Sequence, residues 1–506
     1  MAGGFALPAL LLPGGELGRG IAADAEFDEI EWCGHGRRHR PGREPPQAPA
    51  LNVTRRDLGQ AHTKPLSDRQ QTDAKPTPNG RGDGVAPLRR RVYRWQVRQE
   101  NLMTTHAPHP VRRLPLPEFV AMMALVSAVV AFSIDSMLPA LPEIALELTP
   151  GDLNRAQLVL TAFMAGMGFG TFFSGPLSDA IGRKPAITFG FALYAVAALA
   201  ASQAQSLEFL LAARFVMGLG ASAPRISSMA LVRDLYQGRE MARITSFVSM
   251  VFILIPAVAP LLGRQVIHLF GWHGVFGSFV VLAVIGATWV NLRQAETLPR
   301  EMRRGFSAKS LVSGIIEVAS NRQVMLITVV LALGFGQMFA LLSSAEQIFR
   351  VIYDRGESFP YWFAIMALFA GSASLLNAKM VFRYGMKRMA REAYVMQSVI
   401  SLVMVVLIYG DLLPEVLRFP VFFFWAVTVF AMAGVTFGNL NALALQKMGH
   451  IAGTTASVVS AFSTFGAVAI AAPIGLLFDG TLRPMVAATL ICSCLATVLM
   501  SRIREG

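Results

Sequence analysis

The sequence predicts an all-α membrane protein in which twelve helices cross the bilayer. Of its 506 residues, 54% are hydrophobic and 15% are charged, and its mean hydropathy is +0.49. Soluble domains carry about 25% charged residues, so this chain has too little polar surface to coat a water-soluble globule. The apolar residues also gather in blocks of about 20, each long enough to cross a hydrocarbon core about 30 Å thick.

From Pro117 onward, twelve apolar blocks define the expected spans. They lie near residues 117–139, 154–177, 185–204, 207–231, 244–267, 274–292, 323–345, 360–382, 392–410, 418–440, 453–477 and 483–501. A long basic segment divides them six and six. We therefore predict an N-terminal six-helix bundle at 117–292, a cytoplasmic linker at 293–322 and a C-terminal six-helix bundle at 323–502.

Residues 1–112 differ in composition from the rest of the chain. They are rich in Arg, Pro and Gly, and such a segment buries too little apolar surface to offset its ordering entropy. We interpret it as a disordered basic extension. A mis-assigned translation start, with Met103 or Met122 as the true one, is an alternative, and a basic regulatory tail is another.

Basic residues concentrate in one set of alternate loops. That set contains Arg183 and Lys184, the linker, and a later loop with Arg383 and Lys387, whereas the opposite loops hold only scattered basic residues. Because loops rich in Lys and Arg stay in the cytoplasm, we expect a multi-pass protein of the inner membrane with both termini cytoplasmic. The same loops explain the net charge of +13 without a nucleic-acid partner.

The sharpest local pattern lies between the second and third spans. It contains Gly175, Asp179, Gly182, Arg183 and Lys184, so that an acid precedes a Gly-Arg-Lys turn by about one helical turn. A carboxylate there can accept from a helix N-terminus or pair with a basic side chain. We predict that these five residues form a conformational latch; a simple membrane anchor with a breakable turn is the alternative.

This pattern resembles the loop between helices 2 and 3 of the major facilitator superfamily, with Ala180 where that family usually has a basic residue. A weak internal repeat, in which Gly385 matches Gly182 at the equivalent place of the second half, fits the two-bundle construction of that fold. Residues 210–220 resemble the family's helix 4 motif, with Met217 where Gln is common.

Two further stretches resemble a narrower group. Residues 259–263 resemble the helix 5 motif of proton-driven exporters, in which we place Pro256, Pro260 and Gly263. The two prolines lie one turn apart on one face, where they would kink the helix. Residues 133–142 and 232–234 resemble the bicyclomycin/chloramphenicol-resistance (Bcr/CflA) drug exporters. The resemblance spans roughly residues 117–502.

The resemblance implies a proton-coupled antiporter that exports drugs or other small amphipathic molecules across the inner membrane, and so contributes to antibiotic resistance. Its partners would be a small-molecule substrate, protons and the lipid bilayer, and we expect a monomer without a cofactor. A dedicated exporter of one metabolite or peptide on the same fold is an alternative. A multispan membrane enzyme, from another class, is disfavoured because His268 and His273 have no acid partner close in sequence.

Asp135 is the residue that we expect to carry protons. It lies in the outer half of the first span, inside an otherwise uncharged block, where an ionised Asp costs about 2.5–3.5 kcal/mol on insertion scales. A surrounding of low dielectric constant favours the neutral carboxyl group, so proton loading becomes possible near neutral pH. The alternative is an interfacial acid that caps the helix end near Pro139.

Two arginines of the fourth span complete the predicted coupling site. Arg214 and Arg225 are eleven residues apart, which is about three whole turns, so both lie on one stripe that must face the protein interior or water. Arg214 lies at about the depth of Asp135. We predict a switchable pair in which protonation of Asp135 releases Arg214 and shifts the balance between outward-open and inward-open states. For Arg225, a snorkelling or structurally paired side chain is the alternative.

The second half carries milder polar residues within its spans. We predict a substrate cavity formed by Gln337, Asn377, Asn439 and Asn441; ordinary lipid-facing or packing positions are the alternative. Glu346 closes the seventh span, and we expect it at the outer interface. No metal site is expected, because the three cysteines have no ligand spacing.

Overall fold

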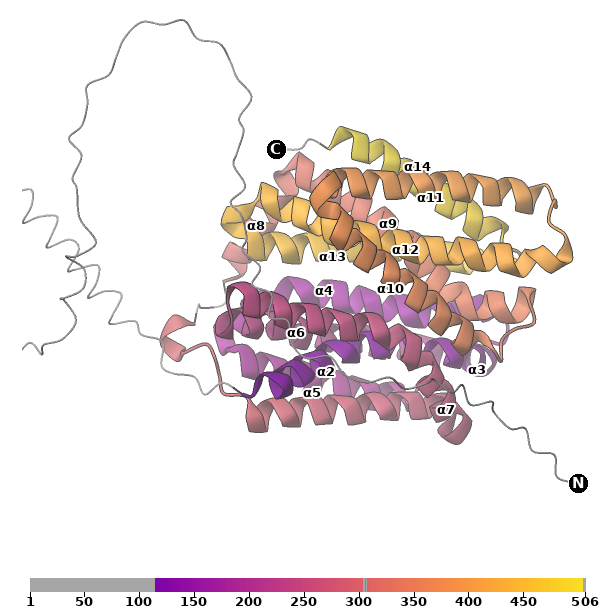
Figure 1. Ribbon diagram of the computed structural model, residues 1–506. Helices are drawn as coiled ribbons and strands as arrows, with labels where there is room; N and C mark the ends of the chain where they lie inside the picture. The colour runs from indigo at the N-terminus through magenta and orange to yellow at the C-terminus, as the bar shows by residue number, and fades with distance from the viewer. Residues whose placement is uncertain (1–113, 304, 306, 504–506) are drawn as a thin grey trace, which may run out of the picture. The chain divides into compact units, whose positions relative to one another are not determined.

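The computed structural model describes residues 114–303, 305 and 307–503 (Figure 1). These residues form helices and turns, and no β-strand occurs among them. The disordered extension predicted for residues 1–112 lies outside the described residues. The prediction of an all-α fold is confirmed.

The first half of the described chain contains five long helices, α2, α4, α5, α6 and α7, together with short elements. Their bounds are α2 Leu116–Asp135, η1 Leu138–Ala140, α3 Leu141–Leu148, η2 Leu153–Gln157, α4 Leu158–Ile181, α5 Arg183–Ala201, α6 Leu207–Leu235 and α7 Gly238–Arg293. Gly271 breaks α7 with a non-helical backbone, at φ 64° and ψ −177°. Because this break falls between the predicted fifth and sixth spans, α7 is two helices joined by one residue.

The second half begins with a linking segment and continues with six long helices. The linking elements are η3 Arg300–Met302 and α8 Ala308–Ser320. The elements that follow are α9 Arg322–Gln347, η4 Ile348–Ile352, α10 Phe359–Tyr384, α11 Met386–Tyr409, α12 Glu415–Lys447, η5 Gly449–Ile451, α13 Ala452–Leu476 and α14 Arg483–Arg502.

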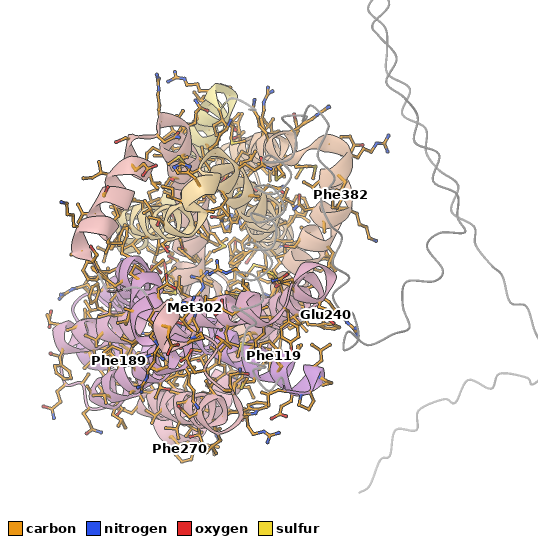
Figure 2. The ribbon with its side chains drawn as sticks, turned by 90° about the vertical axis from the view of Figure 1, so that its left-hand side faces the viewer. Phe119, Phe189, Glu240, Phe270, Met302 and Phe382 are labelled. Atoms are coloured by element: carbon orange, nitrogen blue, oxygen red, sulfur yellow. The ribbon has the colours of Figure 1, made fainter. Side chains whose placement is uncertain are left out.

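The described helices are long and apolar enough to cross a membrane. Eleven helical stretches meet this condition by length and composition, and one of them is the interrupted helix α7. Counting the two parts of α7 separately gives twelve spans among the described residues, so the predicted number is confirmed. Large apolar side chains such as Phe189, Phe270 and Phe382 project from the outside of the helices (Figure 2), as a lipid-facing surface requires.

The helices form two bundles, drawn as a purple-to-pink group and an orange-to-yellow group in Figure 1. In the first bundle α6 packs against α4 and α5, and α2 packs against α7. In the second, α9 packs against α13, α10 against α12, and α11 against α14. Between the bundles, α4 packs against α13 and α7 packs against α10, and the short elements η1 and η2 also contact α9 and α13, respectively.

The tightest contact in the first bundle depends on glycine. A Cβ atom at Gly218 of α6 would overlap the carbonyl oxygen of Phe163 on α4, and one at Gly166 of α4 would overlap the carbonyl oxygen of Phe215 on α6. The two backbones therefore touch, as small residues allow in membrane helices. This contact fixes the position of α6, which carries both arginines of the predicted coupling site.

Candidate functional site

Arg214 lies in the centre of the first bundle and is 0% exposed. Its Nη2 atom donates to the carbonyl oxygen of Ser133 at 3.1 Å, and its Nε atom donates to the carbonyl oxygen of Val159 at 3.2 Å. The guanidinium carbon lies 4.6 Å from the centre of the Phe163 ring. Its Nη1 atom is buried without a hydrogen-bond partner. A buried cation is thus held by neutral acceptors, and the two N–H donors of Nη1 are left without an acceptor.

Asp135 is the last residue of α2 and is 5% exposed. It faces the protein and not lipid, as the predicted role requires. Arg214 holds the carbonyl of Ser133, which precedes Asp135 by two residues, or about 3 Å of helix rise. Among the described residues no ion pair joins Asp135 to Arg214. The switchable pair stays a prediction, and this structure shows the two side chains apart.

A second polar contact lies beside Arg214. The hydroxyl groups of Ser133 and Tyr194 are 2.5 Å apart, and the Ser133 hydroxyl also donates to the carbonyl oxygen of Val129 at 2.6 Å. Tyr194 belongs to α5 and is 0% exposed. The Ser133 backbone and side chain therefore connect α2 with α5 and α6. The sequence analysis missed Tyr194, although a tyrosine within an apolar span is itself a signal of a buried hydrogen bond.

The helix 5 motif lies against the same end of α2. A Cβ atom at Gly263 would overlap the carbonyl oxygen of Ser136, the residue after Asp135. Pro256 and Pro260 lie inside the first part of α7, and the break in this helix falls at Gly271 instead. The structure thus brings Gly263 next to the predicted proton carrier.

Arg225 is separated from Arg214 in the structure. Both lie on one stripe of α6, and Ser222 on that stripe shares a hydrogen bond of 2.7 Å with Ser174 of α4. One turn further along, Arg225 is exposed. Helix α4 therefore covers the stripe as far as Ser222 and leaves Arg225 open to its surroundings, where a charged side chain in a span requires water.

Four of the five predicted latch residues meet in one cluster. Arg183 donates from Nη1 to Asp179 at 2.5 Å and from Nε to Asp234 at 3.0 Å. The backbone N–H groups of Arg183 and Lys184 donate to the two oxygens of Glu296, at 3.0 and 3.1 Å. The cluster thus ties α4, α5 and the end of α6 to the chain beyond α7. Neither Asp234 nor Glu296 was predicted as a latch residue, because only the tertiary packing brings them to the loop.

Gly182 explains why this cluster needs a glycine. Its φ is +108°, and a Cβ atom there would lie 2.6 Å from Oε2 of Glu296. Gly385 has φ +80° and ψ 153° at the start of α11, against +108° and 161° for Gly182 at the start of α5. The weak repeat in the sequence thus corresponds to the same turn in both bundles. Gly175, the fifth predicted residue, faces α13 instead, and a Cβ atom there would lie 3.8 Å from the Ser457 hydroxyl oxygen.

The two bundles are joined by amide side chains at the end remote from this cluster. We call that contact the seam, and the end that carries Arg183, Lys184, Arg383 and Lys387 the basic end. Gln157 of η2 donates to Gln347 at 2.6 Å and accepts from Ser344 at 2.9 Å. Asn154 of η2 accepts from Gln347 at 2.7 Å and donates to the carbonyl oxygen of Phe478 at 2.7 Å. Hydrogen bonds between amide, hydroxyl and carbonyl groups therefore close the seam in this conformation.

The predicted cavity residues of the second bundle do not form one group. Asn439 of α12 donates to the side-chain oxygen of Asn377 on α10 at 2.8 Å. Gln337 is 0% exposed and accepts from Ser493 at 2.9 Å, and Asn441 donates to the carbonyl oxygen of its own helix. The structure brings Asn377 and Asn439 together and leaves Gln337 and Asn441 apart from them.

The described residues contain no candidate cluster of metal ligands. No group of three or more His, Cys, Asp or Glu side chains there is arranged to hold a metal ion.

Known proteins resemble this chain in sequence and in fold. A profile of the Major Facilitator Superfamily matches residues 123–501. A bicyclomycin resistance protein homolog of Haemophilus influenzae is 28% identical over 351 residues, which cover 67% of this chain and 84% of that protein. The multidrug resistance protein MdtL of a Shewanella species is 32% identical over 193 residues, which cover 36% of this chain and 48% of that protein.

A solved structure shows the same fold. The crystal structure of the D-xylose-proton symporter matches with a TM-score of 0.62 and 12% sequence identity, over 77% of this chain and 97% of that chain. At this identity the likeness concerns the arrangement of helices and not the substrate.

Proposed function

Because the chain belongs to the Major Facilitator Superfamily, we propose that it is a proton-coupled antiporter that exports drugs or other small amphipathic molecules. Membership of this family makes it a multi-pass membrane transporter and not an enzyme. The names of two relatives, a bicyclomycin resistance protein homolog and a multidrug resistance protein, support drug export. We propose a monomer as the working unit, because one chain supplies both bundles and the pathway would run between them.

The observation that carries the proposal is the unpartnered Nη1 atom of buried Arg214. Buried charged donors in proteins rarely lack a hydrogen-bond acceptor, so we infer that another conformation supplies an acceptor for Nη1. Asp135 is the candidate that we favour, because it is a buried acid two residues after Ser133, whose carbonyl Arg214 already holds. An ionised Asp135 would accept from Arg214, and a protonated Asp135 would leave Arg214 on the backbone carbonyls, as found here.

This exchange couples protons to the movement of the bundles. Arg214 contacts α2 and α4, while α7 touches α2 at Gly263 and packs on α10 of the second bundle. A change of bonding at the end of α2 would therefore reach a helix that joins the two halves. Asp135 would take up a proton from the outside and release it inside while the substrate moves outward, and this exchange is antiport.

We assign the basic end to the cytoplasm by the positive-inside rule. The chain would then lie in the inner membrane with both termini cytoplasmic, and the seam would close the outer face. Arg225, exposed toward the basic end, would line a cytoplasmic entrance for substrate. The Arg183 cluster lies at this same end, where we propose that it acts as the latch of the first bundle.

The proposal is tested by dye transport into inverted membrane vesicles under an imposed proton gradient. Asp135→Asn should abolish gradient-driven transport, because the amide cannot exchange a proton. Asp354→Asn is the matched control, since Asp354 is exposed and has φ 52°, a conformation that Asn tolerates. Equal transport by wild type and Asp135→Asn would remove Asp135 from coupling. Wild-type transport that survives a protonophore would contradict proton coupling itself.

A further inference from the structure

Glu346 is a buried carboxylic acid of the second bundle that the coupling scheme does not use. It lies one residue before the end of α9 and is 5% exposed. Its partner is Arg350, one turn further along the chain, with 3.1 Å between Nε and Oε1. The Arg350 side chain is 39% exposed, so the pair has one buried and one solvated member.

Glu346 faces the first bundle across the seam. A small pocket between the bundles is lined by Glu346, Arg350 and Gln347 from one side, and by Leu141, Ala145 and Gln157, among others, from the other side. The amide hydrogen bonds of Gln157 and Gln347 lie beside it. The burial of Glu346 therefore depends on contact between the bundles and would end if the seam parted.

The charged groups of the neighbouring elements have other partners. On α3, Glu143 accepts from the backbone N–H of Trp272 at 3.1 Å, and Glu147 accepts from its indole N–H at 2.7 Å. On η2, Arg155 pairs with Glu208 at 2.9 Å.

Beyond the end of α13, Asp479 accepts from Thr481, and this hydrogen bond lowers the pKa of Asp479 below its usual range. Of the residues that line the pocket, Glu346 and Arg350 carry charge.

Seam closure and the charge of Glu346 are consequently linked. Closing the seam takes the carboxyl group out of water, which disfavours its ionised form. Arg350 offsets only part of this cost, because its side chain is half-solvated and water weakens the ion pair. A group that binds its proton more tightly in the closed state makes closure more favourable as pH falls.

We propose that Glu346 makes the seam a proton-sensitive outer gate: protonation of Glu346 from the outside favours the closed seam, and ionisation favours its opening. The proton is exchanged with external water while the seam is open. This site lies in the second bundle and is separate from Asp135 in the first. The inference rests on the proposed function only for which end faces outward.

The gate can be measured without substrate or gradient by the distance between two spin labels in nanodiscs. Labels at Gly151→Cys and Leu412→Cys, both exposed positions, report on the two bundles once Cys33, Cys492 and Cys494 are replaced by serine. Between pH 8.5 and 5.5, we expect the short-distance, closed population to increase. Glu346→Gln should stay closed throughout, because the amide is a permanently neutral mimic of the protonated acid.

Two further variants complete the test. Glu357→Gln, which neutralises an exposed acid in the loop between η4 and α10, should keep the wild-type response. Arg350→Gln removes the group that stabilises ionised Glu346 inside the closed seam, and should therefore increase the open population at pH 8.5 above that of wild type.

Three results would each overturn the proposal: a wild-type distance that does not change with pH, a Glu346→Gln response equal to that of Glu357→Gln, or an Arg350→Gln open population at pH 8.5 no larger than that of wild type. Loss of proton coupling in vesicles would instead contradict the proposed function, and the label distances would be unaffected.

Discussion

Gly263 lies directly against the carbonyl oxygen of Ser136, so the helix 5 motif touches the residue that follows Asp135. A methyl group cannot fit there unless α7 and α2 move apart. Gly263→Ala should therefore destabilise the protein by about 1–3 kcal/mol, the usual cost of overpacking. The measurement is the fraction that stays monodisperse in detergent after heating across a range of temperatures.

Gly277→Ala is the control for that substitution. Gly277 lies in the second part of the same helix, and nothing stands within 4 Å of its would-be Cβ atom. Alanine also has the higher helix propensity, so this variant should be as stable as wild type or more so. Similar losses in both variants would show that the Ser136 contact is not what constrains Gly263.

Arg214→Lys should lose most gradient-driven transport. The guanidinium group donates to the carbonyls of Ser133 and Val159 at the same time, a fixed geometry that an ammonium group cannot reproduce. Loss of one hydrogen bond to a charged group costs about 1.5–3 kcal/mol, so we expect at least a roughly tenfold decrease in the vesicle assay.

Arg155→Lys provides the comparison for Arg214→Lys. Arg155 forms an ion pair with Glu208 in which both side chains are well exposed, and such pairs contribute little. Its transport should match wild type. An Arg214→Lys protein that transports as well as Arg155→Lys would mean that only the positive charge at this position matters.

The spans were predictable because a bilayer imposes a length on every apolar helix. The last span, expected at 483–501, is Arg483–Arg502, whereas the tenth, expected at 418–440, extends over Glu415–Lys447. Hydropathy detects the part of a helix that lies in hydrocarbon and misses polar turns that continue into water. For the same reason the linking helix α8 was not predicted.

The functional contacts were only partly predictable. Helical periodicity correctly placed Arg214 in the interior, because eleven residues return to the same face. Its acceptors are backbone carbonyls, which every residue carries, so no residue type in the sequence marks them. Glu346 was expected at the outer interface, but its burial by contact between the two bundles was not predicted. Sequence reasoning fails where burial depends on a partner element hundreds of positions away.

Gly182→Ala should open the latch cluster at the basic end. At φ +108° and ψ 161° a side chain is strained, and the new Cβ atom would displace Glu296 from the N–H groups of Arg183 and Lys184. The residues after α7 should then become more exposed. Hydrogen–deuterium exchange of peptides covering residues 291–303 measures this change, and we expect exchange at least several times faster than in wild type.

Gly238→Ala is the control that distinguishes the effect of backbone strain from the effect of displacing Glu296. Gly238 also has a positive φ, of +56°, but nothing stands within 4 Å of its would-be Cβ atom. Its effect should stay local to the start of α7. If both alanine variants speed exchange over residues 291–303 equally, the contact between Gly182 and Glu296 has no special role.

Gln157→Ala should open the seam independently of pH. Gln157 donates to Gln347 and accepts from Ser344, and net hydrogen bonds of this neutral kind contribute about 0.5–1.5 kcal/mol each. Losing two of them should reduce the closed-to-open ratio of the label pair at residues 151 and 412 by about 5-fold or more at every pH. The response to pH should remain in Gln157→Ala, because Glu346 is still present. The double variant Gln157→Ala/Glu346→Gln should lose that response and should be more open than Glu346→Gln alone.

Gln323→Ala at the opposite end of α9 is the control and should leave the distances unchanged. A closed population in Gln157→Ala equal to wild type would show that apolar contacts, and not these amides, hold the two bundles together at the seam.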